Sequence, residues 1–306
     1  MFTDPPDHLS RPTLTGSFGM AASTNWVASG VAQSVLERGG NAFDAAVAAG
    51  FVMHVVEPHL NGPGGDLVAL ATPAGGTTLV INGQGPAPRG ADIEHYRSLG
   101  LESVPGAGAL ASAVPGAVEG WLWILRELGT WDLADVLAYV LHYAEHGHPL
   151  LPNAARTIAT VADLFRDHWP TSAQLWLASG RAPKAGTIHR NTAYARTLRR
   201  LLAAADTATG REARIDAAAR EWRTGFVAEA AVRTARTVHR HADGGDYAGV
   251  LSVDDFAEFR VRAEEPVRFT FRGTTIAKAG FWSQGPVLLQ TLAILDHFDD
   301  ADLAPS

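Results

Sequence analysis

The chain has 306 residues, of which 46% are apolar and 19% are charged, and it contains no Cys. This composition excludes a mainly disordered chain, and the lack of Cys excludes disulfide frameworks, thiolate nucleophiles and Cys-ligated zinc or iron–sulfur sites. With 25 Lys and Arg against 32 Asp and Glu, the formal net charge is −7. That charge argues against a nucleic-acid-binding protein that depends on phosphate contacts. The polar, Pro-rich start of the chain has no signal-peptide pattern, so we expect a cytoplasmic protein.

The first part of the chain predicts two helices and a β-hairpin. Asn25 can cap a helix that Gly39 and Gly40 end, and Asn41 can start a second helix over residues 42–56. The second helix is apolar on nearly every side but too short to span a membrane, so we expect it to be buried. The apolar runs at residues 67–71 and 77–81 predict a hairpin whose strands are buried on both faces. Helices must therefore cover this sheet on at least one side.

The rest of the chain predicts more helices and a second pair of strands. Helical periodicity runs from about residue 118 to 144, and several amphipathic helices follow between residues 153 and 242. Alternating residues predict strands at 267–272 and 274–277, followed by a helix from about 286 to 298. The order predicts a mixed α/β (α+β) fold with much antiparallel pairing. Because no repeat or linker appears, we expect residues 1–306 to form a single unit.

Several motifs point only weakly to a function. The segment Gly106–Ala111 fits a loose dinucleotide-binding pattern, but it lacks the strand and helix that this pattern requires, so we interpret it as a small-residue loop. His239 and His241 are two residues apart, and we interpret them as part of a solvated helix end rather than a metal site. His142 and His146 are four apart near a predicted helix end, and no HExxH motif occurs. We therefore expect no metal site.

The residues alone identify no nucleophile. We expect His54, inside an apolar helix, to be a core histidine bonded to backbone. The sequence has no GxSxG motif, and Ser283 is the nearest approach to a serine elbow. A general acid/base pair cannot be selected from the 32 acidic residues by sequence alone.

Longer motifs in chain order resemble the γ-glutamyltranspeptidase family. Residues 39–48 read GGNAFDAAVA and residues 55–65 read VVEPHLNGPGG, which match that family's GGNAxDAAVA and VxEPxxxGxGG. Further similarity lies at residues 114–121, 144–147, 251–259 and 283–290. The resemblance covers about residues 15–298.

The resemblance implies an αββα N-terminal nucleophile hydrolase, of which this chain is the large-subunit part with an added helical region. In that family the precursor cuts itself, and the new N-terminal Thr of the small subunit is the nucleophile, with its own amino group as base. The nearest match to the TxHxxVxD nucleophile motif is Thr237–Asp243, which we interpret as a coincidence. The catalytic residues would then lie on a partner chain. In typical members, the large subunit continues through a helical region well beyond the segment that matches residues 288–298, whereas this sequence stops at Ser306.

The resemblance also places candidate substrate-binding residues. An Arg in an FRExxP-like segment holds the substrate α-carboxylate in typical members, and Gln84 stands at that position within Ile81–Pro88. A shift of the alignment would instead assign Arg89. Asn82 and Trp282 are the other candidates, the latter because Gly280–Trp282 replaces a Pro-rich segment and indicates an aromatic wall.

The resemblance implies a hydrolase or acyltransferase that cleaves an amide-type bond without a metal or other cofactor. Its substrate would be a small acyl or peptide-like molecule other than a standard γ-glutamyl compound, as in specialised metabolism. The expected partner is a small subunit from the same precursor, with higher oligomers of that heterodimer possible and no nucleic acid or membrane. Two alternatives stay open: a non-catalytic relic that acts as a scaffold, and a genuine γ-glutamyl hydrolase or transferase for glutathione-like substrates.

Overall fold

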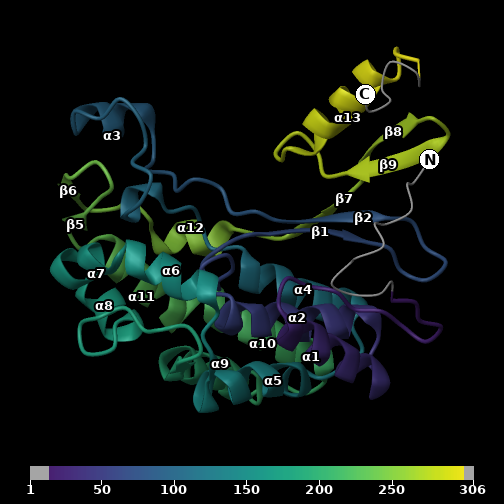
Figure 1. The fold of residues 1–306 in the computed structure, drawn as a ribbon, viewed down its shortest axis with the longest axis horizontal. Helices are drawn as coiled ribbons and strands as arrows, with labels where there is room; N and C mark the ends of the chain where they lie inside the picture. Colours follow the sequence, from purple (N-terminus) through teal and green to yellow (C-terminus); the bar gives the residue numbers. More distant parts are fainter. Residues whose placement is uncertain (1–13, 300–306) are drawn as a thin grey trace.

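The computed structural model of this chain describes residues 14–299. A layer of helices lies beneath a small antiparallel sheet, and a β-hairpin with the last helix lies above that sheet (Figure 1). The arrangement confirms the predicted mixed α/β fold with antiparallel pairing.

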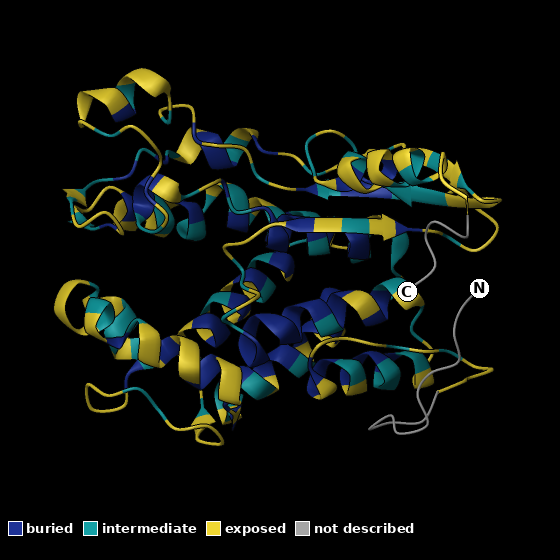
Figure 2. Cartoon of the chain, turned by 45° about the horizontal axis from the view of Figure 1, so that its top comes forward, coloured by how far each residue is buried: buried dark blue, intermediate teal, exposed yellow. Residues whose placement is uncertain are grey.

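Helix α2 (Ala42–Val56) is the centre of the helical layer. It packs against α1 (Trp26–Glu37), α4 (Ala117–Leu128) and α5 (Leu133–His146), and most of its residues are buried, as its composition predicts. Figure 2 shows this concentration of buried residues in the helices under the sheet. The periodic segment predicted from 118 to 144 forms two helices, α4 and α5, because the first helix ends at Leu128 and the second begins at Leu133. Helices α9 (Thr192–Ala205) and α10 (Arg211–Thr224) complete the layer.

A fully buried carboxylate, that of Asp44, joins these helices. Asn41 and Asp44 form a reciprocal capping box at the start of α2, so the predicted Asn41 cap is confirmed. The same carboxylate accepts hydrogen bonds from the backbone N–H groups of Thr130 (2.8 Å) and Trp131 (3.0 Å) and from the Thr130 hydroxyl (2.7 Å). Asp44 thereby fixes the α4–α5 connection against the start of α2.

The central sheet has the strand order β1 (Leu67–Ala71), β2 (Leu79–Gly83), β7 (Arg262–Glu264). Strand β2 begins at Leu79, two residues later than predicted, because the turn is longer. The prediction that the strands are buried on both faces was wrong for β1: Val68 is 50% and Leu70 48% exposed. Helices cover one face of the sheet, and the other face of β1 is open.

The upper part consists of the hairpin β8 (Val267–Phe271) and β9 (Thr274–Lys278), against which α13 (Gly285–Leu295) packs. Both strands and the helix agree with the predicted elements, with α13 ending three residues earlier. No helix in the described part of the chain has both the length and the apolar character needed to cross a membrane. The remaining elements are α3 (Ile93–Ser98), η1 (Ala109–Ala111), β3 (His148–Pro149), α6 (Pro152–Thr160), α7 (Ala162–His168), α8 (Pro170–Trp176), β4 (Ile188–His189), α11 (Phe226–Ala235), β5 (His239–Arg240), β6 (Asp246–Tyr247) and α12 (Val253–Glu258).

The Asp44 contacts give a prediction about stability. Replacing Asp44 with Ala leaves several buried N–H and hydroxyl groups without an acceptor, so we expect the free energy of unfolding to fall by roughly 3 kcal/mol. Asp163→Ala is the matched control, because this carboxylate is 86% exposed and pairs with Arg166 on the same helix; it should change stability by about 0–1 kcal/mol. Urea unfolding of both variants measures the difference. Equal losses in the two variants would refute the role given to Asp44.

Candidate active-site region

The end of β2 is held in place by a close crossing of two backbone segments. A Cβ at Gly85 would lie 1.6 Å from the carbonyl oxygen of Val114, and a Cβ at Gly116 would lie 2.0 Å from the carbonyl oxygen of Gly83. Glycine is therefore required at both positions. The backbone N–H of Val114 also donates to the carbonyl of Pro86 at 2.9 Å. The residues that follow β2 thus have a fixed path.

A second buried carboxylate, Asp255, ties this path to α12. Asp255 forms a capping box with Ser252 and also accepts the backbone N–H of Arg89 at 3.0 Å. Burial alone would raise the pKa of Asp255, but the hydrogen bonds from Arg89 and Ser252 outweigh it, and the pKa is lowered. The carboxylate is therefore charged and fully engaged in structural hydrogen bonds.

A cavity of about 420 Å³ lies between these two segments. Asn82, Gln84 and Arg89 line one side of it, so the structure brings together two predicted substrate-binding residues and the residue of the alternative alignment. Arg260 and Arg262 also line the cavity; Arg260 lies just before β7, and Arg262 is the first residue of that strand. Sequence reasoning missed these two arginines, because only the pairing of β2 with β7 brings them here.

Trp282, the third predicted residue, is connected to this region without lining the cavity. Its Nε1–H donates to Glu264 Oε2 at 2.7 Å, and the Asn82 amide donates to Glu264 Oε1 at 3.0 Å. The neighbouring aromatic residue of the predicted wall, Phe281, is 88% exposed. Glu264 therefore bridges Asn82 and Trp282 and sets the orientation of both. This role could not be identified from sequence, because Glu264 lies 182 residues after Asn82.

The three arginines of the cavity differ in their partners. The Arg89 guanidinium pairs with Glu258, and Arg260 donates to the carbonyl groups of Ala257 and Phe259 at the end of α12. The Arg262 guanidinium has neither a hydrogen-bond nor an ion-pair partner among residues 14–299. One guanidinium in the cavity is thus free to bind an anion.

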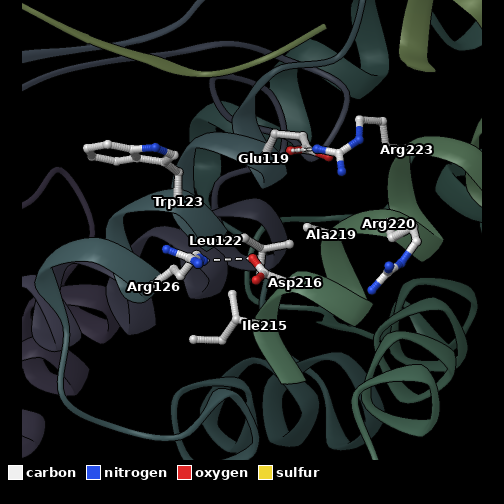
Figure 3. Close-up of a pocket in the computed structure, with 9 residues that line it drawn as sticks. All are labelled: Glu119, Leu122, Trp123, Arg126, Ile215, Asp216, Ala219, Arg220 and Arg223. Carbon is white, nitrogen blue, oxygen red and sulfur yellow. Dashed lines mark hydrogen bonds and ion pairs between the residues drawn. The ribbon is translucent and has the colours of Figure 1, made fainter. Parts of the chain in front are cut away.

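A second cavity, of about 360 Å³, lies between α4 and α10 (Figure 3). Within it Arg223 donates to the buried carboxylate of Glu119 at 3.1 Å. Burial raises the pKa of Glu119 to about 7, while the nearby guanidinium groups of Arg223 and Arg260 act in the opposite direction. One oxygen of Glu119 and the Nε of Arg223 have no hydrogen-bond partner in the described part of the chain.

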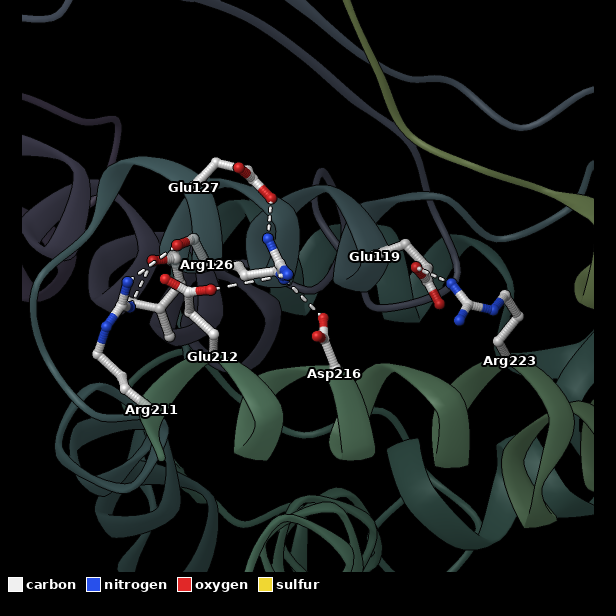
Figure 4. A network of polar contacts seen from close by, with 8 residues as sticks. Glu119, Arg126, Glu127, Arg211, Glu212, Asp216 and Arg223 are labelled. Carbon is white, nitrogen blue, oxygen red and sulfur yellow. Dashed lines mark hydrogen bonds and ion pairs between the residues drawn. The ribbon is translucent and has the colours of Figure 1, made fainter. Parts of the chain in front are cut away.

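The other charged groups at this cavity pair with one another and connect the two helices (Figure 4). Arg126 of α4 binds Asp216 of α10 at 2.8 Å and lies 3.8 Å from Glu212. Arg211 donates to the carbonyl groups of Leu125 and Arg126. These contacts satisfy the end of α4 and hold α10 against it, so we assign this cavity a structural role.

The interpretation of His239 and His241 as a solvated helix end was wrong. The two rings are stacked with their centroids 4.9 Å apart. Their Nε2 atoms accept the backbone N–H groups of Ala109 and Leu110 at 3.1 and 3.0 Å, and His241 is only 2% exposed. These contacts hold the 106–111 segment in place. They also occupy N–H groups that a phosphate would need there, in agreement with its interpretation as a small-residue loop.

The other candidate histidines have structural roles. His54 is buried as predicted, but its Nδ1 bonds the Tyr194 hydroxyl at 2.9 Å rather than backbone, and burial lowers its pKa to about 3. His142 and His146 stack near the end of α5. The residues with described positions include no group of three or more His, Asp or Glu that could hold a metal ion.

Comparison with known proteins places these observations in a family. The sequence model of the family described as gamma-glutamyltranspeptidase matches residues 28–306. The oxamate amidohydrolase proenzyme of Klebsiella pneumoniae subsp. pneumoniae is 38% identical over 189 residues, which cover 60% of this chain and 35% of the relative. The chain spans about half the length, or less, of the curated relatives it matches.

Solved structures show the same fold. LmbA2991HD is 53% identical, with a TM-score of 0.92, over 94% of this chain and 49% of the other. The gamma-glutamyltranspeptidase of Helicobacter pylori is 26% identical, with a TM-score of 0.82, over 96% of this chain and 79% of the other. The predicted N-terminal nucleophile hydrolase fold is confirmed by this similarity.

The environment of Glu119 predicts a pH dependence. Because the folded-state pKa is raised, the stability that the neutral carboxyl contributes is fully present below about pH 4.5 and is lost as the pH rises to about 7. Glu119→Gln cannot titrate, so its stability should fall less over this range than that of the original protein. Urea midpoints measured from pH 4.5 to 7.5 test this.

The matched control for this measurement is Glu127→Gln, which changes an exposed carboxylate of the same helix. It should follow the pH profile of the original protein. A Glu119→Gln profile parallel to that of the original protein would contradict the assigned role of Glu119.

Proposed function

This chain belongs to the gamma-glutamyltranspeptidase family, and from that premise we propose that it is the large-subunit part of a self-processed hydrolase or acyltransferase. The enzyme would cleave an amide-type acyl bond through an N-terminal Thr on a second polypeptide. The observation that carries the proposal is the cavity at Gln84. Its walls come from the segments at residues 82–89, 114 and 255–262, which lie within the part matched by the family and are far apart in sequence.

The exposed face of strand β1 supports the proposal of a second polypeptide. Val68 and Leu70 of β1 are about half exposed, and Val287 and Leu288 of α13 are 63% and 44% exposed. Exposed apolar groups on these two elements are of the kind that another chain covers. The curated relatives are proenzymes about twice as long as this chain. We therefore propose that the remaining part packs on this face.

The division of labour follows from the side chains at the cavity. Asn82, Gln84 and the arginines can donate hydrogen bonds to an acyl group, but none of them is a hydroxyl or thiol nucleophile. An N-terminal Thr would supply the nucleophile, and its α-amino group would take the hydroxyl proton. This chain would then bind and orient the acyl group while the partner attacks its carbonyl carbon.

The acyl group is proposed to differ from γ-glutamyl because position 84 holds a neutral amide. Gln84 can donate hydrogen bonds to a carboxylate, but it cannot form the bidentate, charged contact of an arginine. The relative named oxamate amidohydrolase supports a broader substrate range among similar chains.

The first test of this proposal is the polypeptide composition of the protein expressed from its complete coding sequence. Intact mass measurement and N-terminal sequencing should find a second chain that begins with Thr. Hydrolysis of an acyl p-nitroanilide should persist after treatment with a chelator, because the proposed chemistry needs no metal. The absence of a Thr-initiated chain would refute the enzyme proposal and favour a non-catalytic scaffold.

The second test concerns position 84. Gln84→Arg should raise kcat/KM for γ-glutamyl p-nitroanilide about ten- to hundredfold, because a charged hydrogen bond contributes about 1.5–3 kcal/mol. Gln174→Arg adds the same charge on an exposed part of α8, outside the cavity, and should have no effect. An unchanged rate in Gln84→Arg would remove Gln84 from the substrate pocket.

A further inference from the structure

The free guanidinium of Arg262 occupies a defined position beside the predicted substrate-binding residues. In the antiparallel pairing of β2 with β7, Arg262 lies directly opposite Asn82. Directly opposite residues project from the same face of a sheet. Gln84 follows Asn82 by two residues and lines the same cavity as both. An amide and a guanidinium from neighbouring segments therefore face one volume.

The charged side chains that line this cavity do not balance. The lining includes three arginines, Arg89, Arg260 and Arg262, and two carboxylates, Asp255 and Glu258, so it carries one excess positive charge. Asp255 is already engaged by backbone N–H groups, and Glu258 is engaged by Arg89. Arg260 donates to the carbonyl groups of Ala257 and Phe259, whereas the Arg262 guanidinium has neither a hydrogen-bond nor an ion-pair partner among the described residues.

We propose that Arg262 binds a carboxylate on the acyl part of the substrate, with the side-chain amide of Gln84 donating a further hydrogen bond to it. The inference rests on the proposed function and names its substrate class: amides of acids that have a second, free carboxylate. A planar guanidinium presents parallel N–H groups that match the two oxygens of a carboxylate. One uncompensated charge suits a monoanion better than a phosphate dianion.

Glu264 leaves the Arg262 guanidinium unpaired. It lies two residues beyond Arg262 on β7, where an acidic side chain could compete for the guanidinium, but both its oxygens accept hydrogen bonds from Asn82 and Trp282. The Asn82 amide and the Trp282 indole thus hold the carboxylate of Glu264 in its own contacts. Arg262 is left for the ligand.

The test compares two substrates that differ in one charged group. Glutaryl p-nitroanilide has a free carboxylate at the end of its acyl chain, whereas pentanoyl p-nitroanilide has a methyl group there. In the protein expressed from its complete coding sequence, Arg262→Gln should lower kcat/KM for the glutaryl compound about ten- to hundredfold and change the pentanoyl rate less than about twofold. Arg262→Lys should retain part of the glutaryl activity, because it keeps the charge but loses the fork.

The matched control is Arg268→Gln, which removes an exposed guanidinium that lies on β8 and pairs with Glu265. Both substrates should keep their rates in this variant. Equal losses for the two substrates in Arg262→Gln, or an unchanged glutaryl rate, would overturn the inference while leaving the proposed function intact.

A binding measurement separates failure of the inference from failure of the proposed function. If the original protein hydrolyses neither anilide, the proposed function fails, and calorimetric titration with glutarate then decides on Arg262. Binding that weakens at least about tenfold in Arg262→Gln but not in Arg268→Gln supports the carboxylate site. Equal binding in all three proteins, or no binding to the original protein, overturns it.

Discussion

The backbone crossing at the end of β2 determines where the candidate site can be. Gly85 passes the carbonyl of Val114, and Gly116 passes the carbonyl of Gly83, at distances that leave no room for a Cβ. Hydrogen bonds from Gly116 and Ala117 to the carbonyl of Gly65, each 2.9 Å long, add a third segment to the same junction. Three parts of the chain are thus held together by backbone contacts alone. The side chains around them remain available for a ligand.

Two buried carboxylates stabilise the elements on either side of this crossing in the same way. Asp44 satisfies N–H groups between α4 and α5, and Asp255 satisfies the N–H of Arg89 as well as the start of α12. Both charges are compensated mainly by backbone and hydroxyl donors. Guanidinium groups are therefore not required as their partners. Glu119 is different, because it is buried against the guanidinium of Arg223, and one of its oxygens has no hydrogen-bond partner within residues 14–299.

The sequence predicted the features that depend on local patterns. The buried helix over residues 42–56 and its Asn41 cap follow from composition and spacing. The order of the family motifs led to Asn82 and Gln84, which line one cavity, and their role in substrate binding stays a prediction. Features that depend on distant contacts could not be predicted. Arg262 lies 180 residues after Asn82, and only the β2–β7 register places it there. The imidazoles of His239 and His241 likewise find their N–H donors about 130 residues earlier in the chain. The open face of β1 escaped prediction because an apolar strand does not reveal what covers it.

The pairing of β2 and β7 allows the guanidinium of the proposed site to lie at position 262 instead of position 84 without a change of fold. Residues that leave the end of β2 and residues at the start of β7 border one cavity, so a guanidinium on either strand reaches the same volume from a different direction. In the proposed site, the cation that the family resemblance places at position 84 comes from position 262, which alters the geometry of the anion contact but none of the backbone contacts that form the cavity. An acyl group whose carboxylate points toward β7 would gain from that change, and one whose carboxylate points along β2 would lose. In the proposed site, substrate preference therefore depends on whether the cation follows β2 or lies on β7, and the strand pairing brings both positions to one cavity.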